Sequence, residues 1–111
     1  MMISSDLNQI EKITKTEKYA IVSVLSQIMN ADGVIHPKEV EFMDSIYRKL
    51  DITIEEIQEV MNLDPIQAKI IIDEMSIENK QVAKALFDSM ASSDGFVHPK
   101  ETAIIESLFS F

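Results

Sequence analysis

The sequence predicts an all-α protein, a compact bundle of about five to seven helices. Apolar residues recur at helical spacing nearly throughout the chain, as in the set Ile21, Val24, Leu25 and Ile28. No segment alternates apolar and polar residues in the way that a half-buried strand does. With only two Gly and three Pro, the chain has few of the residues that hairpin turns need. These observations favour helices joined by short connections.

Capping residues divide the first half of the chain into helices. A short helix or turn is expected near residues 5–13, and Thr16 is expected to cap a helix that ends near Asn30. Pro37 suits the first position of the next helix. The apolar side chains of that helix are Val40, Met43, Ile46, Tyr47 and Leu50.

The second half of the chain contains further helix-start signals. Thr53 and Glu56 have the spacing of a capping box, and they predict a short helix. That helix is expected to turn four apolar residues inward, namely Ile54, Ile57, Val60 and Met61. Three more helices are expected to begin at Asp64-Pro65 (covering about 65–75), Ser76 and Pro99.

A nearly identical phrase occurs twice in the chain, as MNADGVIHPKE at residues 29–39 and MASSDGFVHPKE at residues 90–101. The offset is 62 positions, so that residue 32 matches residue 94. Apolar positions outside the phrase keep the same register, in the pairs Leu25/Phe87, Ile28/Met90, Met43/Ile105 and Ile46/Leu108. We therefore expect one domain over 1–111 with two equivalent helix–turn–helix units, near 16–50 and 77–111.

One interpretation of the repeated turn is structural. Gly33 suits the left-handed conformation that often ends a helix, and Pro37 suits the first turn of the next helix. His36 then becomes the N-cap, and Glu39 completes a capping box three residues later. The second copy has the same residues in the same places: Gly95, His98, Pro99 and Glu101.

The other interpretation of the repeated turn is a site for a divalent cation. Both copies resemble part of the calcium-loop pattern, but Ile28 and Met90 stand where that pattern requires Asp. A standard calcium loop is therefore not expected. Imidazole with carboxylates is a workable ligand set for other divalent metals. The candidate ligands are Asp32, His36, Glu39, Asp94, His98 and Glu101.

The segments IMNADGVIHPKE and MASSDGFVHPKE also carry a resemblance to a known family. A helix that ends in Asp-Gly, followed by a branched aliphatic residue and a Glu in the next helix, resembles the TerB-like family of tellurite-resistance proteins. The N-terminal region of a DnaJ-type membrane co-chaperone is similar. The resemblance covers about residues 16–111. It implies a compact helical domain with an acidic face, binding of divalent cations and a role in stress-response assemblies, without enzymatic activity.

The resemblance assigns its acidic positions to four residues of this chain, Asp32, Glu39, Asp94 and Glu101. It assigns no role to the two His-Pro pairs. Tellurite resistance is the property that names the family, whose members occur in many contexts.

Charge and composition exclude several classes of function. The net charge of −9 disfavours nucleic acid and anionic membrane surfaces and favours cations or basic protein surfaces. A protein partner is therefore expected, and a homo-oligomer is compatible with the sequence. The absence of Cys excludes disulfides and thiolate metal sites. Without a signal-peptide pattern or a long apolar run, we expect a cytoplasmic protein that is not inserted in a membrane.

The sequence favours a binding module over an enzyme. It has no Cys nucleophile, no nucleophile-elbow pattern and no phosphate-cradling loop. The alternative is a metal-assisted hydrolase that uses the His, Asp and Glu residues of the two turns. We therefore expect a non-catalytic acidic helical module for protein interaction, with a divalent cation as the candidate ligand of the two Asp-Gly corners.

Overall fold

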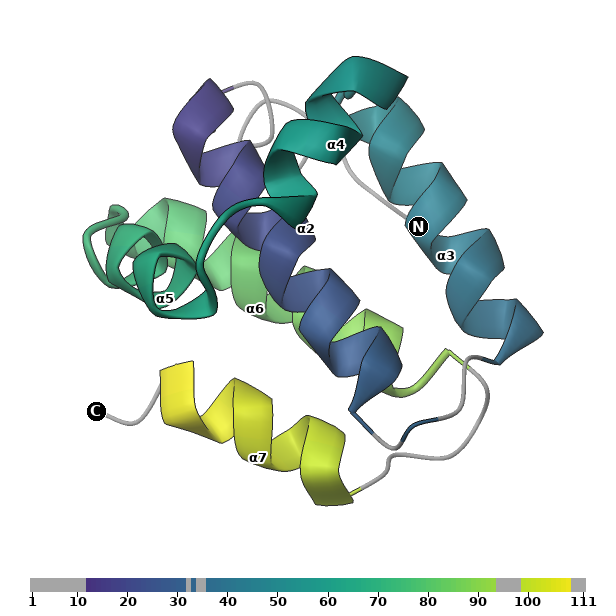
Figure 1. The fold of residues 1–111 in the computed structure, drawn as a ribbon. Helices are drawn as coiled ribbons and strands as arrows, with labels where there is room; N and C mark the ends of the chain where they lie inside the picture. Colours follow the sequence, from purple (N-terminus) through teal and green to yellow (C-terminus); the bar gives the residue numbers. More distant parts are fainter. Residues whose placement is uncertain (1–11, 32, 34–35, 94–98, 109–111) are drawn as a thin grey trace.

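The computed structural model describes residues 12–31, 33, 36–93 and 99–108. These residues form six helices and no strand (Figure 1), which confirms the predicted all-α fold class. The helices are α2 (Lys15–Asn30), α3 (Pro37–Lys49), α4 (Ile54–Met61), α5 (Pro65–Asp73), α6 (Ile77–Ala91) and α7 (Pro99–Leu108). The short helix or turn expected near residues 5–13 lies almost wholly outside the described residues. Within the described part of the chain, none of the helices has the length and apolarity needed to cross a membrane.

Helix α2 lies at the centre of the bundle and contacts α4, α5, α6 and α7. Six consecutive residues, 20–25, are buried. Because an α-helix completes a turn in about 3.6 residues, such a run places buried residues on all sides of the helix. This explains why residues 20–25 contain five apolar residues and only one polar residue, Ser23. The other helices form a shell around α2, with α3 packed against α6.

Equivalent positions of the two repeat units are buried alike. Leu25 and Phe87 are both fully buried, and Ile28 and Met90 are as well. Two further pairs, Met43/Ile105 and Ile46/Leu108, also belong to the core. The end of α2, the start of α3, the end of α6 and the start of α7 lie at the same end of the molecule (Figure 1, lower right). The helix ends that flank the two copies of the phrase thus lie at one end of the bundle.

Most predicted helix starts are confirmed, but the first is wrong. Thr53, Asp64 and Ser76 each accept a hydrogen bond from a backbone N–H of the helix that they cap. Helix α2 is capped by Thr14 and not by Thr16. The physical reason is the capping box: Thr14 Oγ1 accepts from the N–H of Glu17 at 3.1 Å, and the N–H of Thr14 donates to Glu17 Oε1 at 2.9 Å.

The predicted inward face of α4 is correct only in part. Val60 is buried, whereas Ile54 and Met61 are 74% and 58% exposed. Successive residues are about 100° apart around a helix, so Ile54 lies about 120° from Val60 and faces away from the core. Val40, one of the apolar side chains predicted for α3, is 44% exposed. These apolar side chains therefore lie on the surface and contribute little to the core.

Candidate functional site

The first duplicated corner contains the turn that the sequence predicts. Helix α2 ends at Asn30, and the N–H of Gly33 donates to the carbonyl oxygen of Asn30 at 3.1 Å. Gly33 has a φ of +77°, the left-handed conformation expected for this glycine. A β-carbon at Gly33 would have no heavy atom within 4 Å, so backbone strain alone restricts the position.

We expect Gly33→Ala to lower the free energy of unfolding by about 1 kcal/mol, because a β-carbon opposes positive φ. Gly33→Asn should cost less, since Asn tolerates this conformation better than Ala. Urea unfolding of the two variants and the parent measures the difference. An alanine variant as stable as the parent would contradict the assignment.

The predicted cap of α3 is also present. His36 is the N-cap, and Pro37 is the first residue of the helix. The N–H of His36 donates to Glu39 Oε1 at 3.2 Å, and only 1% of Glu39 is exposed. Glu101 has the equivalent place in α7, which begins at Pro99, and is 2% exposed. Two carboxylates of the repeated phrase are therefore buried at helix starts, which favours the structural interpretation of the Glu residues.

Part of the predicted metal site lies outside the residues that the structure describes. Asp32, Asp94, Gly95 and His98 all lie outside them. Among the residues that the structure does describe, no group of three or more His, Asp or Glu is placed to hold a metal ion. Cation binding at the corners therefore stays a prediction.

Titration with calcium, magnesium, manganese or zinc tests that prediction. If the corners bind a cation, amide NMR signals of residues near Gly33 and Pro99 should shift with saturation. Asp32→Asn and Asp94→Asn should weaken the response, because each removes a charged ligand. A titration without site-specific shifts at either corner would leave the repeated phrase with a structural role alone.

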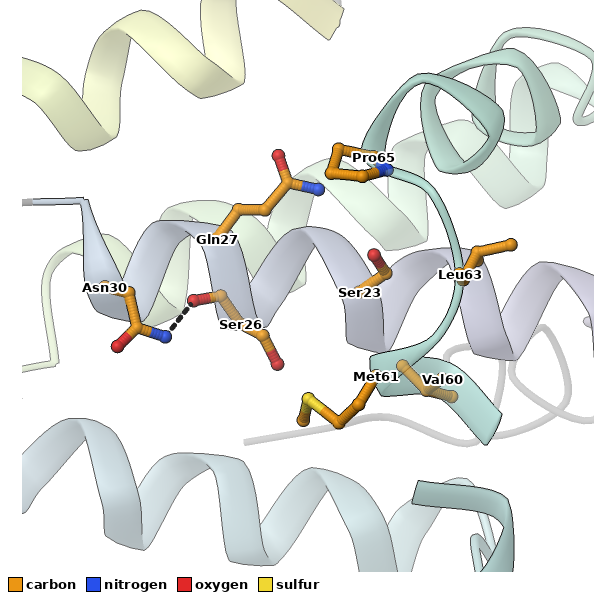
Figure 2. Close-up of a pocket in the computed structure, with 8 residues that line it drawn as sticks. All are labelled: Ser23, Ser26, Gln27, Asn30, Val60, Met61, Leu63 and Pro65. Atoms are coloured by element: carbon orange, nitrogen blue, oxygen red, sulfur yellow. Dashed lines mark hydrogen bonds between the residues drawn. The ribbon is translucent and has the colours of Figure 1, made fainter. Parts of the chain in front are cut away.

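A groove lies along α2, beside α4 and the start of α5 (Figure 2), and we call it the α2 groove. Its volume is about 310 Å³. Its floor consists of polar side chains on one face of α2, namely Ser23, Ser26, Gln27 and Asn30. Its wall consists of apolar side chains from the end of α4 to the start of α5, namely Val60, Met61, Leu63 and Pro65.

Two polar atoms of the groove floor have no hydrogen-bond partner. These atoms are Ser26 Oγ and Gln27 Nε2, and both are buried. Asn30, in contrast, donates from Nδ2 to the carbonyl oxygen of Ser26 at 2.8 Å (Figure 2). A buried polar group without a partner costs about 1–3 kcal/mol, so a ligand that bonds to these atoms would recover part of that cost.

Sequence reasoning missed the α2 groove, although the chain contains a signal for it. The floor residues stand at positions 23, 26, 27 and 30, which is the i, i+3, i+4, i+7 spacing of one helix face. A polar stripe beside the apolar residues of a helix indicates a face that does not lie wholly in the core. The wall could not be foreseen in the same way, because it comes from residues 60–65, far from α2 in the sequence.

The wall of the groove belongs to a strongly acidic part of the chain. Residues 50–68 contain five acidic residues and no basic residue, and we call them the acidic segment. Four of the five acidic side chains are exposed: Asp51, Glu55, Glu59 and Asp64. Glu59 and Asp64 directly adjoin wall residues in the sequence. The groove thus combines an apolar wall with a neutral polar floor, and two exposed carboxylates, Glu59 and Asp64, are sequence neighbours of its wall.

The fifth acidic residue of the segment, Glu56, joins α4 to α2. Glu56 Oε2 accepts from the Tyr19 hydroxyl at 2.8 Å and lies 3.5 Å from Lys15 Nζ. The pKa of Glu56 is lowered from 4.5 to about 2, mainly by the hydrogen bond from the Thr53 backbone and then by the bond from Tyr19. Burial and the hydrogen bond to Glu56 raise the pKa of Tyr19 above its usual value of 10.0. Both groups are moved away from neutral pH, which suits a structural pair better than an acid–base catalyst.

We expect Glu56→Gln to be less stable than the parent at neutral pH, with a difference that depends on pH. Because the folded pKa of Glu56 is about 2 and its reference value is 4.5, the charged carboxylate stabilises the fold above pH 4.5. This contribution is lost as the pH falls from 4.5 to about 2. Urea midpoints measured across this range should converge for the two proteins.

A second variant checks the cause of that pH dependence. Tyr19→Phe removes one donor to Glu56, so the folded pKa of Glu56 should rise toward 4.5, and the loss of stability in acid should be smaller and be complete at a higher pH than in the parent. Stability curves of parent and Glu56→Gln that stay parallel down to pH 2 would contradict the lowered pKa of Glu56.

Comparison with known proteins gives no relative for this chain: no family model, curated protein or solved structure matches it.

Proposed function

We propose that this chain is a non-catalytic, acidic helical module that binds a protein partner. The observation that supports the proposal best is the acidic segment and the α2 groove beside it, where Met61 is 58% exposed. A charged surface attracts partners of opposite sign, and exposed apolar side chains contribute affinity once water is displaced. The TerB-like resemblance adds a stress-response assembly as the context of this binding and a divalent cation as a candidate ligand of the corners.

The alternative function is a metal-assisted hydrolase that uses the His, Asp and Glu residues of the two corners. The geometry of Glu39 favours this alternative less. The Glu39 carboxylate is 1% exposed and accepts the N–H of His36, so it serves the start of α3 and does not face a substrate. The shifted pKa values of Tyr19 and Glu56 also favour fixed protonation states. These observations support binding over catalysis.

Affinity capture tests the proposed function. The tagged chain, expressed in the cells that naturally contain it, should retain a discrete protein partner at low salt. Raising the NaCl concentration to about 1 M reduces the Debye length to about 3 Å, and this should release the partner. Retention of no specific partner would overturn the proposal, and so would hydrolase activity that requires Glu39 and an added metal ion.

A further inference from the structure

We propose that the α2 groove binds a short segment of a partner protein that combines apolar side chains with Lys or Arg. This inference rests on the proposed function and deepens it, because it assigns the partner's chemistry and the place where it binds. Three features of the groove lead to it: the apolar wall, the polar atoms of the floor that have no partner, and the charge of the acidic segment.

The wall specifies the apolar part of the partner. Met61 is the last residue of α4, and its side chain extends along α2 toward Ser26 (Figure 2). Met is flexible and polarisable, so it adapts to a range of apolar side chains. The groove volume of about 310 Å³ is at the lower end for ligand pockets, which suits one or two anchoring side chains and not a large cofactor.

The floor specifies a hydrogen-bonding partner. Gln27 extends its amide toward Pro65 at the opposite side of the groove (Figure 2), and its Nε2 has no hydrogen-bond partner. Ser26 Oγ is in the same condition. An extended peptide segment has backbone carbonyl oxygens and N–H groups that are free to pair with such side chains, whereas the backbone groups of a helix are already paired. A rotation of either side chain would bring its polar atom to a peptide in the groove.

The acidic segment specifies the charge of the partner. Four exposed carboxylates and no cation occupy residues 50–68, and none of the groove-lining residues is charged. A segment with Asp or Glu would be repelled, and a neutral apolar segment would gain nothing from this charge. A segment that places Lys or Arg beside its apolar anchors is complementary to the wall and to the carboxylates of Glu59 and Asp64, which adjoin the wall in the sequence.

Peptide selection tests the proposal on the intact chain. Short random peptides displayed on phage are selected on the immobilised protein, and enriched sequences are synthesised and titrated by fluorescence anisotropy. We expect the enriched peptides to combine Lys or Arg with Leu, Ile, Met or Phe. Enrichment of acidic or uncharged peptides would overturn the proposal, and so would the absence of any binder.

Matched variants locate the binding site. Met61→Asp should weaken peptide binding about tenfold or more, because it puts a charge in the apolar wall. Ile77→Asp makes the same change of charge at a 73% exposed apolar residue outside the groove and should leave binding nearly unchanged. Glu59→Lys should weaken binding more than Glu106→Lys, since both variants have the same net charge but only Glu59 adjoins the wall.

A further pair of variants separates binding from stability. Gln27→Met keeps the length of the side chain and removes the amide, so binding should weaken several-fold while the thermal midpoint stays the same or rises. Gln81→Met, on the exposed surface of α6, should change neither. Equal affinity of the parent, Met61→Asp and Gln27→Met for the selected peptides would place binding elsewhere and overturn the groove proposal.

The outcomes also distinguish this inference from the proposed function. If the cellular partner is retained equally by the parent and Met61→Asp, the chain is an interaction module but the α2 groove is not its site. If analytical ultracentrifugation shows a dimer of the parent that Met61→Asp dissociates, the occupant is a second copy of this chain, and the partner-segment proposal is wrong.

Discussion

Replacing Phe87 with Ala is expected to lower the free energy of unfolding by about 3–5 kcal/mol, the largest effect that we predict for this protein. Phe87 is fully buried and lies on α6, which packs along the central helix α2. The substitution removes a ring from a closely packed interior and leaves a cavity that neighbouring side chains fill only in part. For a domain whose total stability is about 5–15 kcal/mol, such a loss removes a large fraction of it.

Urea unfolding followed by circular dichroism measures this loss. Leu25→Ala, at the equivalent position of the first repeat, should cost about 2–5 kcal/mol for the same reason. Ile77→Ala is the control, because Ile77 is 73% exposed and should change stability by about 0.5 kcal/mol or less. A Phe87→Ala variant within about 1 kcal/mol of the parent would show that α6 does not pack on α2 as described.

Glu39→Ala is expected to lower the free energy of unfolding by about 2 kcal/mol, the largest loss that we predict for a polar residue. The carboxylate is 1% exposed and accepts a hydrogen bond from the N–H of His36. Its removal leaves a donor at the start of α3 without this acceptor and a small cavity beneath it. Glu39→Gln retains an acceptor oxygen and should cost less than Glu39→Ala.

The measurement of Glu39 should be made in buffer that contains a chelator. Under that condition a loss of stability reports the structural role, because no divalent cation is available to bind. Glu41→Ala is the matched control: Glu41 is exposed, and its contact with Lys38 at 3.9 Å is a surface pair. If Glu39→Ala matches the parent with chelator and loses a cation-induced gain in stability without it, Glu39 is a ligand and not a cap.

Local signals in the sequence were sufficient for most of the fold. Thr53, Asp64 and Ser76 are caps whose side chains bond to the next turn of the chain, so their effect depends on residues nearby. The error at the start of α2 is of the same local kind. Thr14 has Glu17 three residues later and Thr16 has Tyr19, so the capping-box rule favours Thr14.

Features that depend on distant contacts could not be predicted. The inward face of α4 is predicted only in part, because Val60 meets the core whereas Ile54 and Met61 do not, and the packing of α4 on α2 decides this. The bond from Tyr19 to Glu56 joins residues 37 positions apart and leaves no pattern in the sequence. The floor of the α2 groove is visible as a polar stripe, whereas its wall depends on where α4 ends and α5 begins.

The central position of α2 has a consequence for how the protein is made. Helix α2 is the first of the described helices to leave the ribosome, and its partner α7 ends at Leu108, 78 residues after Asn30. At a synthesis rate of roughly 5–20 residues per second, the apolar surface of α2 waits roughly 4–16 s for its last partner. During that interval its side chains are available to chaperones or to other nascent chains. The helix that is most completely enclosed in the finished protein is therefore the one exposed longest during its synthesis.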